Sequence, residues 1–495
     1  MSQPAPAPRP PDPSSLPALR ERHGPRYRWL LLLSVMIGTM ASVMSSTIVN
    51  VAIPDLSHHF HLGQERAQWV TSGFMVAMTI SMLTTPWLLD RFGYRRTYVG
   101  TMLLLLAGGV GGGLSDLYGL VLAARVAEGL AAGVVQPIPA IIVMRAFQPH
   151  EQGRAIGIFS MGVVLAPAIG PSVGGLLVDL FGWRSIFFMV VPFCVASIWL
   201  ALRFVPNSAP GKAAGQAAPL DWGGLLLGAA GTLCLLNGLV ELHGGTPLEA
   251  ALLLAGALLS LVAFVVWQRR QERAGGSPLM RLTLFDNRAF AMGSIVSFIY
   301  GIALFGSTYL LPVYMQLGLG LSASYVGTIL LPAGFVLAVA IALVGRMADR
   351  QPTWLLVSVG LALLATSFAL MATLQLGAPL WPLVLFTVLG RIGLGFILPS
   401  LNLGAMRGLD TALIPQGSSA INFVRMLGGA AGVGLCGIVL EWRLAVHGDS
   451  LARVASSPER LRAFDETFLM LAGVCTLAVV AAWQLRAPRA PATRA

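Results

Sequence analysis

Two ionisable residues, Arg125 and Glu128, stand three positions apart in an otherwise apolar run of the sequence. In a helix this spacing brings the two side chains together. Ionisable groups at membrane depth are rare and mark proton or substrate paths. If this run crosses a membrane, Glu128 is predicted to bind a coupling proton beside Arg125, with Gln136 two turns further on. A purely structural ion pair is the alternative, because paired charges also serve packing alone.

A second charged group lies in the loop LLDRFGYRR, between two apolar runs. Asp90 is able to accept hydrogen bonds from Arg91, Arg95 or Arg96, or from a neighbouring helix N-terminus. Gly93 permits a tight turn there. This pattern favours a latch at the cytoplasmic mouth of a transporter. The alternative is a topology signal only, because basic inner loops are ordinary in membrane proteins.

A weak internal repeat links the two halves of the chain. Asp349 and Arg350 follow an apolar run in the second half, as Asp90 and its arginine do in the first. Arg391 takes the place in the second half that Arg125 takes in the first. Transporters built from two related halves bind substrate near the midplane, where the halves meet.

Other polar residues are placed to line a substrate path. Asn422 and Arg425 share one face of a predicted helix. Two buried arginines, Arg391 and Arg425, would attract an anionic group of a substrate or bind backbone carbonyls, and the sequence leaves both open. Ser46 and Asn50 form a polar stripe with Ser42, directed to the bundle interior or to interhelical hydrogen bonds.

The sequence predicts no metal, no cofactor and no enzyme activity. His58, His59 and His61 are expected in a solvated outer loop, without a matching set of cysteines or carboxylates. The four cysteines sit in apolar stretches without CxxC spacing and are interpreted as small core residues. No phosphate-binding loop, nucleophile elbow or HExxH motif appears on an organised soluble domain, which argues against an ATP-driven pump.

Composition places the chain in a lipid bilayer. Of its 495 residues, 56% are hydrophobic and 11% are charged, whereas soluble domains carry about 25% charged residues. Apolar runs long enough to span a bilayer are predicted at 29–53, 67–89, 97–115, 119–144, 153–180, 184–203, 220–240, 247–267, 289–312, 323–346, 354–374, 379–406, 416–443 and 463–485.

These fourteen runs predict an all-α polytopic membrane protein with two six-helix bundles and two additional helices. The net charge of +11 is interpreted as Lys and Arg retained on the cytoplasmic side rather than as a nucleic-acid surface. Both termini are therefore predicted in the cytoplasm. The predicted division is a disordered cytoplasmic tail 1–28, an N-terminal bundle 29–203, a cytoplasmic linker 204–219, two additional helices 220–267, a cytoplasmic loop 268–288, a C-terminal bundle 289–485 and a tail 486–495.

Small residues recur at every fourth position of the run SMGVVLAPAIGPSVGGLL, at Gly162, Ala166, Gly170 and Gly174. On a helix they form a bare stripe that a second helix can approach closely. Two prolines within the run, the second being Pro171, should bend the helix. This suits a moving interface between two bundles, although an ordinary tightly packed membrane helix is the alternative.

Several of these motifs resemble those of the major facilitator superfamily, and of its fourteen-helix drug/proton antiporters in particular. Gly170 to Gly175 (GPSVGG) resembles the G-P-x-x-G-G core of the antiporter motif. The loop with Asp90 resembles the G-x-L-A-D-R-x-G-R-R signature, and the run TIVNVAIP that contains Asn50 resembles a helix-1 motif. Arg125 to Gly129 resembles R-x-x-Q-G, with Glu128 in place of Gln. Ser45 stands where many relatives have an acidic residue that is linked to proton or cation handling, so the resemblance alone does not imply recognition of cationic drugs.

The resemblance implies a secondary transporter of the cytoplasmic (inner) membrane that works by alternating access. The expected activity is proton-coupled export of small amphipathic compounds, with protons, a small-molecule substrate and the lipid bilayer as partners. Export of an endogenous metabolite or lipid is the first alternative, and a non-transporting membrane receptor or enzyme is the second. The sequence does not define a periplasmic adaptor.

Overall fold

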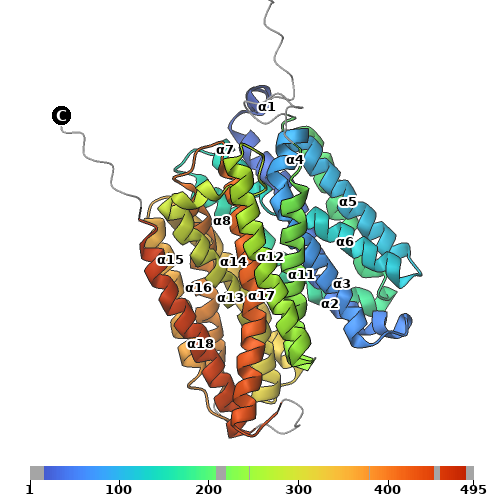
Figure 1. Ribbon diagram of the computed structural model, residues 1–495, viewed down its shortest axis with the longest axis vertical. Helices are drawn as coiled ribbons and strands as arrows, with labels where there is room; N and C mark the ends of the chain where they lie inside the picture. Colours follow the sequence, from blue (N-terminus) through green and yellow to red (C-terminus); the bar gives the residue numbers. More distant parts are fainter. Residues whose placement is uncertain (1–15, 208–218, 245, 378, 451–456, 487–495) are drawn as a thin grey trace, which may run out of the picture.

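The computed structural model describes residues 16–207, 219–244, 246–377, 379–450 and 457–486. Within these ranges the chain forms helices and no strands. Figure 1 shows two helical bundles side by side, the first half of the chain in blue to cyan and the second in yellow to red. Each bundle has a buried apolar core, and that of the first bundle also includes Ala405, Met406, Ile414 and Ile421 of the second.

The first bundle consists of six helical segments, several of them broken by a short turn. Gly93, with φ of 79°, joins two of them in the tight turn expected there. The segments are α2 (Tyr27–His59), α3 (Gln64–Ser81) continuing through η2 (Met82–Thr84) into α4 (Thr85–Phe92), α5 (Tyr94–Leu114), α6 (Tyr118–Val135) with α7 (Ile138–Ala146), α8 (Gln152–Phe181), and α9 (Ser185–Phe188) with α10 (Val190–Phe204).

The second bundle also has six segments. Its first helix ends in η4 (Tyr314–Gly318), a turn of π-helix. The segments are α13 (Arg288–Val313), α14 (Ala323–Ala348), α15 (Thr353–Met371), α16 (Leu380–Met406), α17 (Ile414–Val446) and α18 (Pro458–Trp483).

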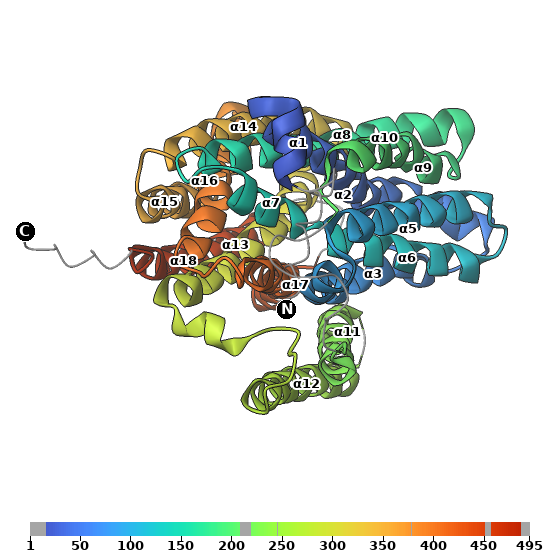
Figure 2. The ribbon, with the colours of Figure 1, turned by 90° about the horizontal axis from the view of Figure 1, so that it is seen from above.

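Two further helices, α11 (Trp222–Gly244) and α12 (Pro247–Arg273), form a hairpin beside the bundles (Figure 2). α11 contacts α3 of the first bundle and α17 of the second. The Oδ1 of Asp221 accepts hydrogen bonds from the Trp267 indole N–H and the Gly224 amide, both at 2.8 Å, and its Oδ2 accepts one from Gln268 at 2.9 Å. This acceptor joins the two helices at one end.

In the described residues, thirteen helical stretches are long and apolar enough to cross a membrane. α8, which has 30 residues, also packs between these stretches, against α2 and α14. A few of its side chains lie outside the described part of the structure. The fold is therefore all-helical, with two six-helix bundles and an additional hairpin, as the sequence predicts. Every predicted span coincides with one of these segments.

Three predicted boundaries are wrong in detail. Residues 16–23 of the expected disordered tail form α1 (Leu16–His23), because Leu19 is buried in the core of the first bundle. α12 continues to Arg273, so the expected loop 268–288 begins as helix. His58 and His59 belong to the last turn of α2 rather than to a loop. Most of the predicted linker 204–219 lies outside the described residues.

Candidate functional site

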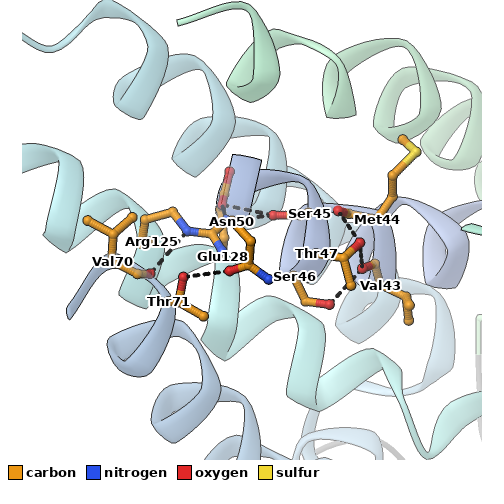
Figure 3. Close-up of polar contacts among 10 residues, drawn as sticks. All are labelled: Val43, Met44, Ser45, Ser46, Thr47, Asn50, Val70, Thr71, Arg125 and Glu128. Carbon is orange, nitrogen blue, oxygen red and sulfur yellow. Dashed lines mark hydrogen bonds and ion pairs between the residues drawn. The ribbon is translucent and has the colours of Figure 1, made fainter. Parts of the chain in front are cut away.

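The predicted pair meets on α6. Nη1 of Arg125 forms an ion pair with Oε2 of Glu128, and both side chains are almost fully buried. Ser45 of α2 completes the group, because its hydroxyl donates to Glu128 Oε2 at 3.0 Å and accepts from Arg125 Nη1 at 2.8 Å. Figure 3 shows the three side chains converging between the two helices. The pair therefore joins α6 to α2.

Two more helices enclose the pair. Arg125 Nε donates to the Val70 carbonyl of α3 at 3.3 Å, and its guanidinium carbon lies 4.3 Å from the centre of the Phe74 ring. On the other side α5 approaches through Gly108, where an added Cβ would lie 2.6 Å from Glu128 Cγ. Glycine at position 108 therefore lets α5 pack directly against the Glu128 side chain.

The two oxygens of the Glu128 carboxyl group differ. Oε2 receives both hydrogen bonds described above, whereas Oε1 is buried without a partner in the described part of the chain. Nη2 of Arg125 is likewise buried without a hydrogen-bond partner in the described part of the chain. A proton added to Oε1 would displace none of the existing hydrogen bonds. The arrangement therefore allows Glu128 to exchange a proton while Ser45 and Arg125 hold its other oxygen.

Ser46 and Asn50, which were predicted to line the substrate path, are engaged locally. Ser46 donates to the Val43 carbonyl at 2.6 Å, one turn earlier in α2. Asn50 is exposed, and its Oδ1 accepts from Thr71 of α3 at 3.0 Å (Figure 3). The Asn50 contact is the interhelical hydrogen bonding that was the alternative for this stripe, whereas the Ser46 bond is intrahelical. A substrate-lining role for these two residues stays a prediction.

A cavity of about 70 Å³ brings together three other predicted residues. Gln136 comes from the connection between α6 and α7, and Asn422 and Arg425 come from α17 of the other bundle. Asn402 of α16 also lines it and was missed, although an asparagine in an apolar run is itself a signal. The cavity thus lies where the two halves meet, as a midplane substrate site requires.

Arg391 does not reach this cavity. It lines a separate small space inside the second bundle with Ser307, Ser367 and Thr387. Its Nε is buried without a hydrogen-bond partner in the described residues. The buried side chain of Tyr300 on α13 lies near both Arg391 and Arg425, so the two guanidinium groups lie in one region of the second bundle.

Asp349, which was predicted as part of a cytoplasmic gate, connects the two halves. Its carboxylate accepts hydrogen bonds from the backbone amides of Gly153 at 2.7 Å and Arg154 at 2.8 Å, at the first turn of α8. Burial raises the pKa of Asp349, and these hydrogen bonds act in the opposite direction. A carboxylate from one half therefore holds the N-terminus of a helix from the other half, where the helix dipole favours negative charge.

In the loop around Asp90, Arg95 contacts the end of α10. Arg95 donates from Nε to the Val205 carbonyl at 2.7 Å, and its backbone amide donates to Pro206 at 3.2 Å. Arg95 therefore fastens the loop to the end of α10. The side chains of Asp90, Arg91, Arg96 and Arg350 are exposed at the same end of the molecule.

The stripe of small residues on α8 packs within its own bundle, which corrects the expectation of an interface between bundles. A Cβ on Gly162 would meet Met36 at 2.7 Å, one on Gly174 would meet Ile48 at 2.5 Å, and one on Gly170 would meet Thr47 at 3.1 Å, all on α2. α8 remains helical through Pro171. Spacing defines the face of a helix, but it does not define which neighbour covers that face.

The contact between bundles lies nearer the start of α8. A Cβ on Gly345 of α14 would lie 2.5 Å from the Cα of Gly157. Nearby, Ser418 of α17 donates to the Pro137 carbonyl at 2.9 Å. These contacts and the Asp349 latch gather at one end of the two halves.

The two halves, the cavity between them and the buried pair on α6 define a secondary transporter of a membrane, not an enzyme. The chain belongs to the Major Facilitator Superfamily, whose family model matches residues 35–433.

Several known proteins are similar over most of the chain. An uncharacterized MFS-type transporter of Mycobacterium tuberculosis, Rv1250, is 31% identical over 94% of this chain and 83% of the relative. A multidrug resistance protein B homolog of the same species is 30% identical over 92% of this chain and 85% of the relative. The crystal structure of the human organic anion transporter MFSD10 has the same fold, with a TM-score of 0.66 and 15% identity over 92% of this chain and 99% of the other.

Proposed function

We propose that the protein exports small amphipathic compounds in exchange for protons, and that Glu128 carries the coupling proton. The observation that supports this most is the Arg125–Glu128–Ser45 group, buried between α6 and α2 with one carboxyl oxygen unpartnered in the described structure. Relatives that are named as multidrug resistance proteins, about as similar as the uncharacterised ones, support the class of substrate.

Coupling follows from the charge of the pair. Protonation of Glu128 at Oε1 would cancel the negative charge that Arg125 faces, while the Ser45 hydroxyl remains within hydrogen-bonding distance of both. An unneutralised guanidinium is costly in a low-dielectric interior, so the four helices around it would rearrange. A change of proton occupancy is thereby converted into a change in the packing of the first bundle.

Alternating access uses the contact between halves. In this structure the Asp349 latch and the close approach of Gly345 to Gly157 hold one end together. Opening that end separates α14 from the start of α8 and exposes the cavity with Gln136 and Arg425. The cavity of about 70 Å³ is far below the roughly 300–1,000 Å³ of ordinary ligand pockets, so substrate entry requires this separation.

We place the protein in the cytoplasmic membrane, with both termini and the latched end on the cytoplasmic side. The excess of Lys and Arg in the segments at that end supports this orientation.

Counterflow in proteoliposomes tests the transport activity. Purified full-length protein is reconstituted, the vesicles are loaded with unlabelled compound, and uptake of trace labelled compound is followed. A panel of amphipathic compounds that is first scored for growth protection of an efflux-deficient host supplies the candidates. Counterflow of a protective compound, and its acceleration by an imposed proton gradient, are expected. A panel in which no compound shows either would contradict the proposed function.

A further inference from the structure

The two halves of the transporter carry different net charge at the level of the cavity. In the first half Arg125 is neutralised by Glu128. In the second half, neither Arg391 nor Arg425 has a carboxylate partner among the described residues, and the side chain of Tyr300 lies near both. The second half therefore holds two positive charges that the described residues leave unbalanced.

Arg425 is the arginine that faces the cavity. Its one hydrogen bond in the described structure runs from Nη2 to Oδ1 of Asn422, a neutral acceptor. Since the remaining N–H groups of the guanidinium fork are not engaged by the protein, they are available to a ligand. Gln136 and Asn402 present side-chain amides to the same cavity, and an amide nitrogen donates to carboxylate or sulfonate oxygens.

Uncompensated charge in a membrane-embedded protein is energetically costly and marks function. A carboxylate or sulfonate at Arg425 would form a charge-assisted hydrogen bond, bidentate where the geometry allows. Arg391, which lies deeper in the second bundle, would strengthen the attraction through the field of its charge without touching the ligand. The attraction is large here because the surroundings are apolar.

A separate apolar pocket lies on another face of α17. It has a volume of about 420 Å³ and is lined by residues of α3, α11, α13 and α17. Met426, next to Arg425 in the sequence, and Gly429, one turn further on, both line it. Figure 2 shows the hairpin of α11 and α12 against the side where α3 and α17 meet, so α11 forms one wall of this pocket.

We propose that the substrates are anionic amphipaths whose carboxylate or sulfonate binds Arg425 between the two halves. This inference rests on the proposed function, because it takes the cavity between the halves as the substrate site. It adds the sign of the charge and the residue that recognises it.

Equilibrium binding to the full-length protein in nanodiscs tests the sign of the charge. Pyrenebutyrate is compared with its uncharged analogue pyrenebutyramide, without a proton gradient. One charge-assisted hydrogen bond corresponds to about 1.5–3 kcal/mol, so the acid should bind about tenfold or more tightly than the amide. Equal affinities, or tighter binding of the amide, would overturn the proposal.

Substitutions assign the effect to a residue. Arg425→Gln should weaken binding of pyrenebutyrate about tenfold or more and leave pyrenebutyramide unchanged. Arg425→Lys keeps the charge but loses the guanidinium fork, so its affinity for pyrenebutyrate should lie between those of the unsubstituted protein and Arg425→Gln. Arg391→Gln should lower the affinity for the acid alone, by a smaller factor. Arg270→Gln, on the exposed surface of α12, is the matched control and should bind both as the unsubstituted protein does.

Two further outcomes separate the alternatives. If Arg425→Gln weakens both pyrene compounds equally while its thermal unfolding is unchanged, Arg425 shapes the cavity and does not read charge, which overturns the proposal. If chloride displaces pyrenebutyrate and the acid loses its advantage over the amide, the site takes an inorganic anion instead. If the unsubstituted protein shows the charge preference but no proton coupling, and the preference persists in Glu128→Gln, the proposed function alone is contradicted.

Discussion

Gly345 of α14 and Gly157 of α8 bring the backbones of the two halves into direct contact, because a Cβ on Gly345 would lie only 2.5 Å from the Gly157 Cα. The Asp349 latch lies one turn away on the same pair of helices. Glycine at both positions is therefore a condition for closing this end of the transporter.

Gly345→Leu is predicted to hold this end apart. Overpacking costs about 1–3 kcal/mol, enough to shift a two-state equilibrium about tenfold or more, so transport should fall by a similar factor. The spacing between spin labels at His150 and Gln351, which are both exposed, should lengthen. Gly327→Leu on the same helix is the control, since nothing lies within 4 Å of its Cβ position. An unchanged label distance in Gly345→Leu would show that this contact takes no part in the transport cycle.

Closure should depend on pH through Asp349. Burial raises the pKa of this carboxyl group in the closed contact, and opening would return it toward its ordinary value. The closed form then binds the proton more tightly, so closure is favoured as the pH falls through the raised pKa and is weakened as the pH rises above it. The same label pair, measured across the acidic range, should show this trend. Asp349→Asn should abolish the pH dependence, and a trend that persists in that variant would belong to another group.

Gly170→Leu is predicted to impair coupling by pushing α2 away from α8. The added side chain would meet Thr47 at 3.1 Å or less, two residues from Ser45, so the Glu128 hydrogen bond should be disturbed. Proton-driven transport should fall while the protein still inserts. Gly111→Leu on α5, where the Cβ position is open, should transport normally. Normal activity of a well-expressed Gly170→Leu protein would show that the α2–α8 contact tolerates expansion.

Asp221→Ala is predicted to loosen the additional hairpin. It leaves the Trp267 and Gln268 donors without their acceptor, and an unsatisfied buried donor costs about 1–3 kcal/mol. The unfolding temperature of the detergent-solubilised protein should fall. In Asp221→Asn, which keeps one acceptor oxygen, the unfolding temperature should fall less. Identical unfolding of all three proteins would mean that apolar packing alone holds the hairpin.

The fold and the ion pair were predictable from local pattern, because apolar length defines a span and three-residue spacing brings Arg125 to Glu128. The partners from other helices were not. Ser45 was interpreted as the loss of an acid, yet its hydroxyl bridges both members of the pair. The bare stripe at Gly162 was predicted to face the other bundle but packs against α2, because the spacing of small residues does not indicate which helix covers them.

The same limit applies to the arginines. Arg425 lines the cavity between the halves, whereas Arg391 lies inside the second bundle. The sequence does not distinguish these two arginines, since each is a single charged residue in an apolar run. Only the tilt and packing of α16 and α17 decide which of them faces the other half.

Substrate-induced proton release from proteoliposomes tests the role of Glu128 most directly. With the unsubstituted protein, addition of a transported compound should produce a pH change, and Glu249→Gln, an exposed carboxyl on α12, should reproduce it. Glu128→Gln should give no pH change while it still exchanges labelled compound downhill. Undiminished proton release by Glu128→Gln would assign the Arg125–Glu128 pair to structure and contradict the account.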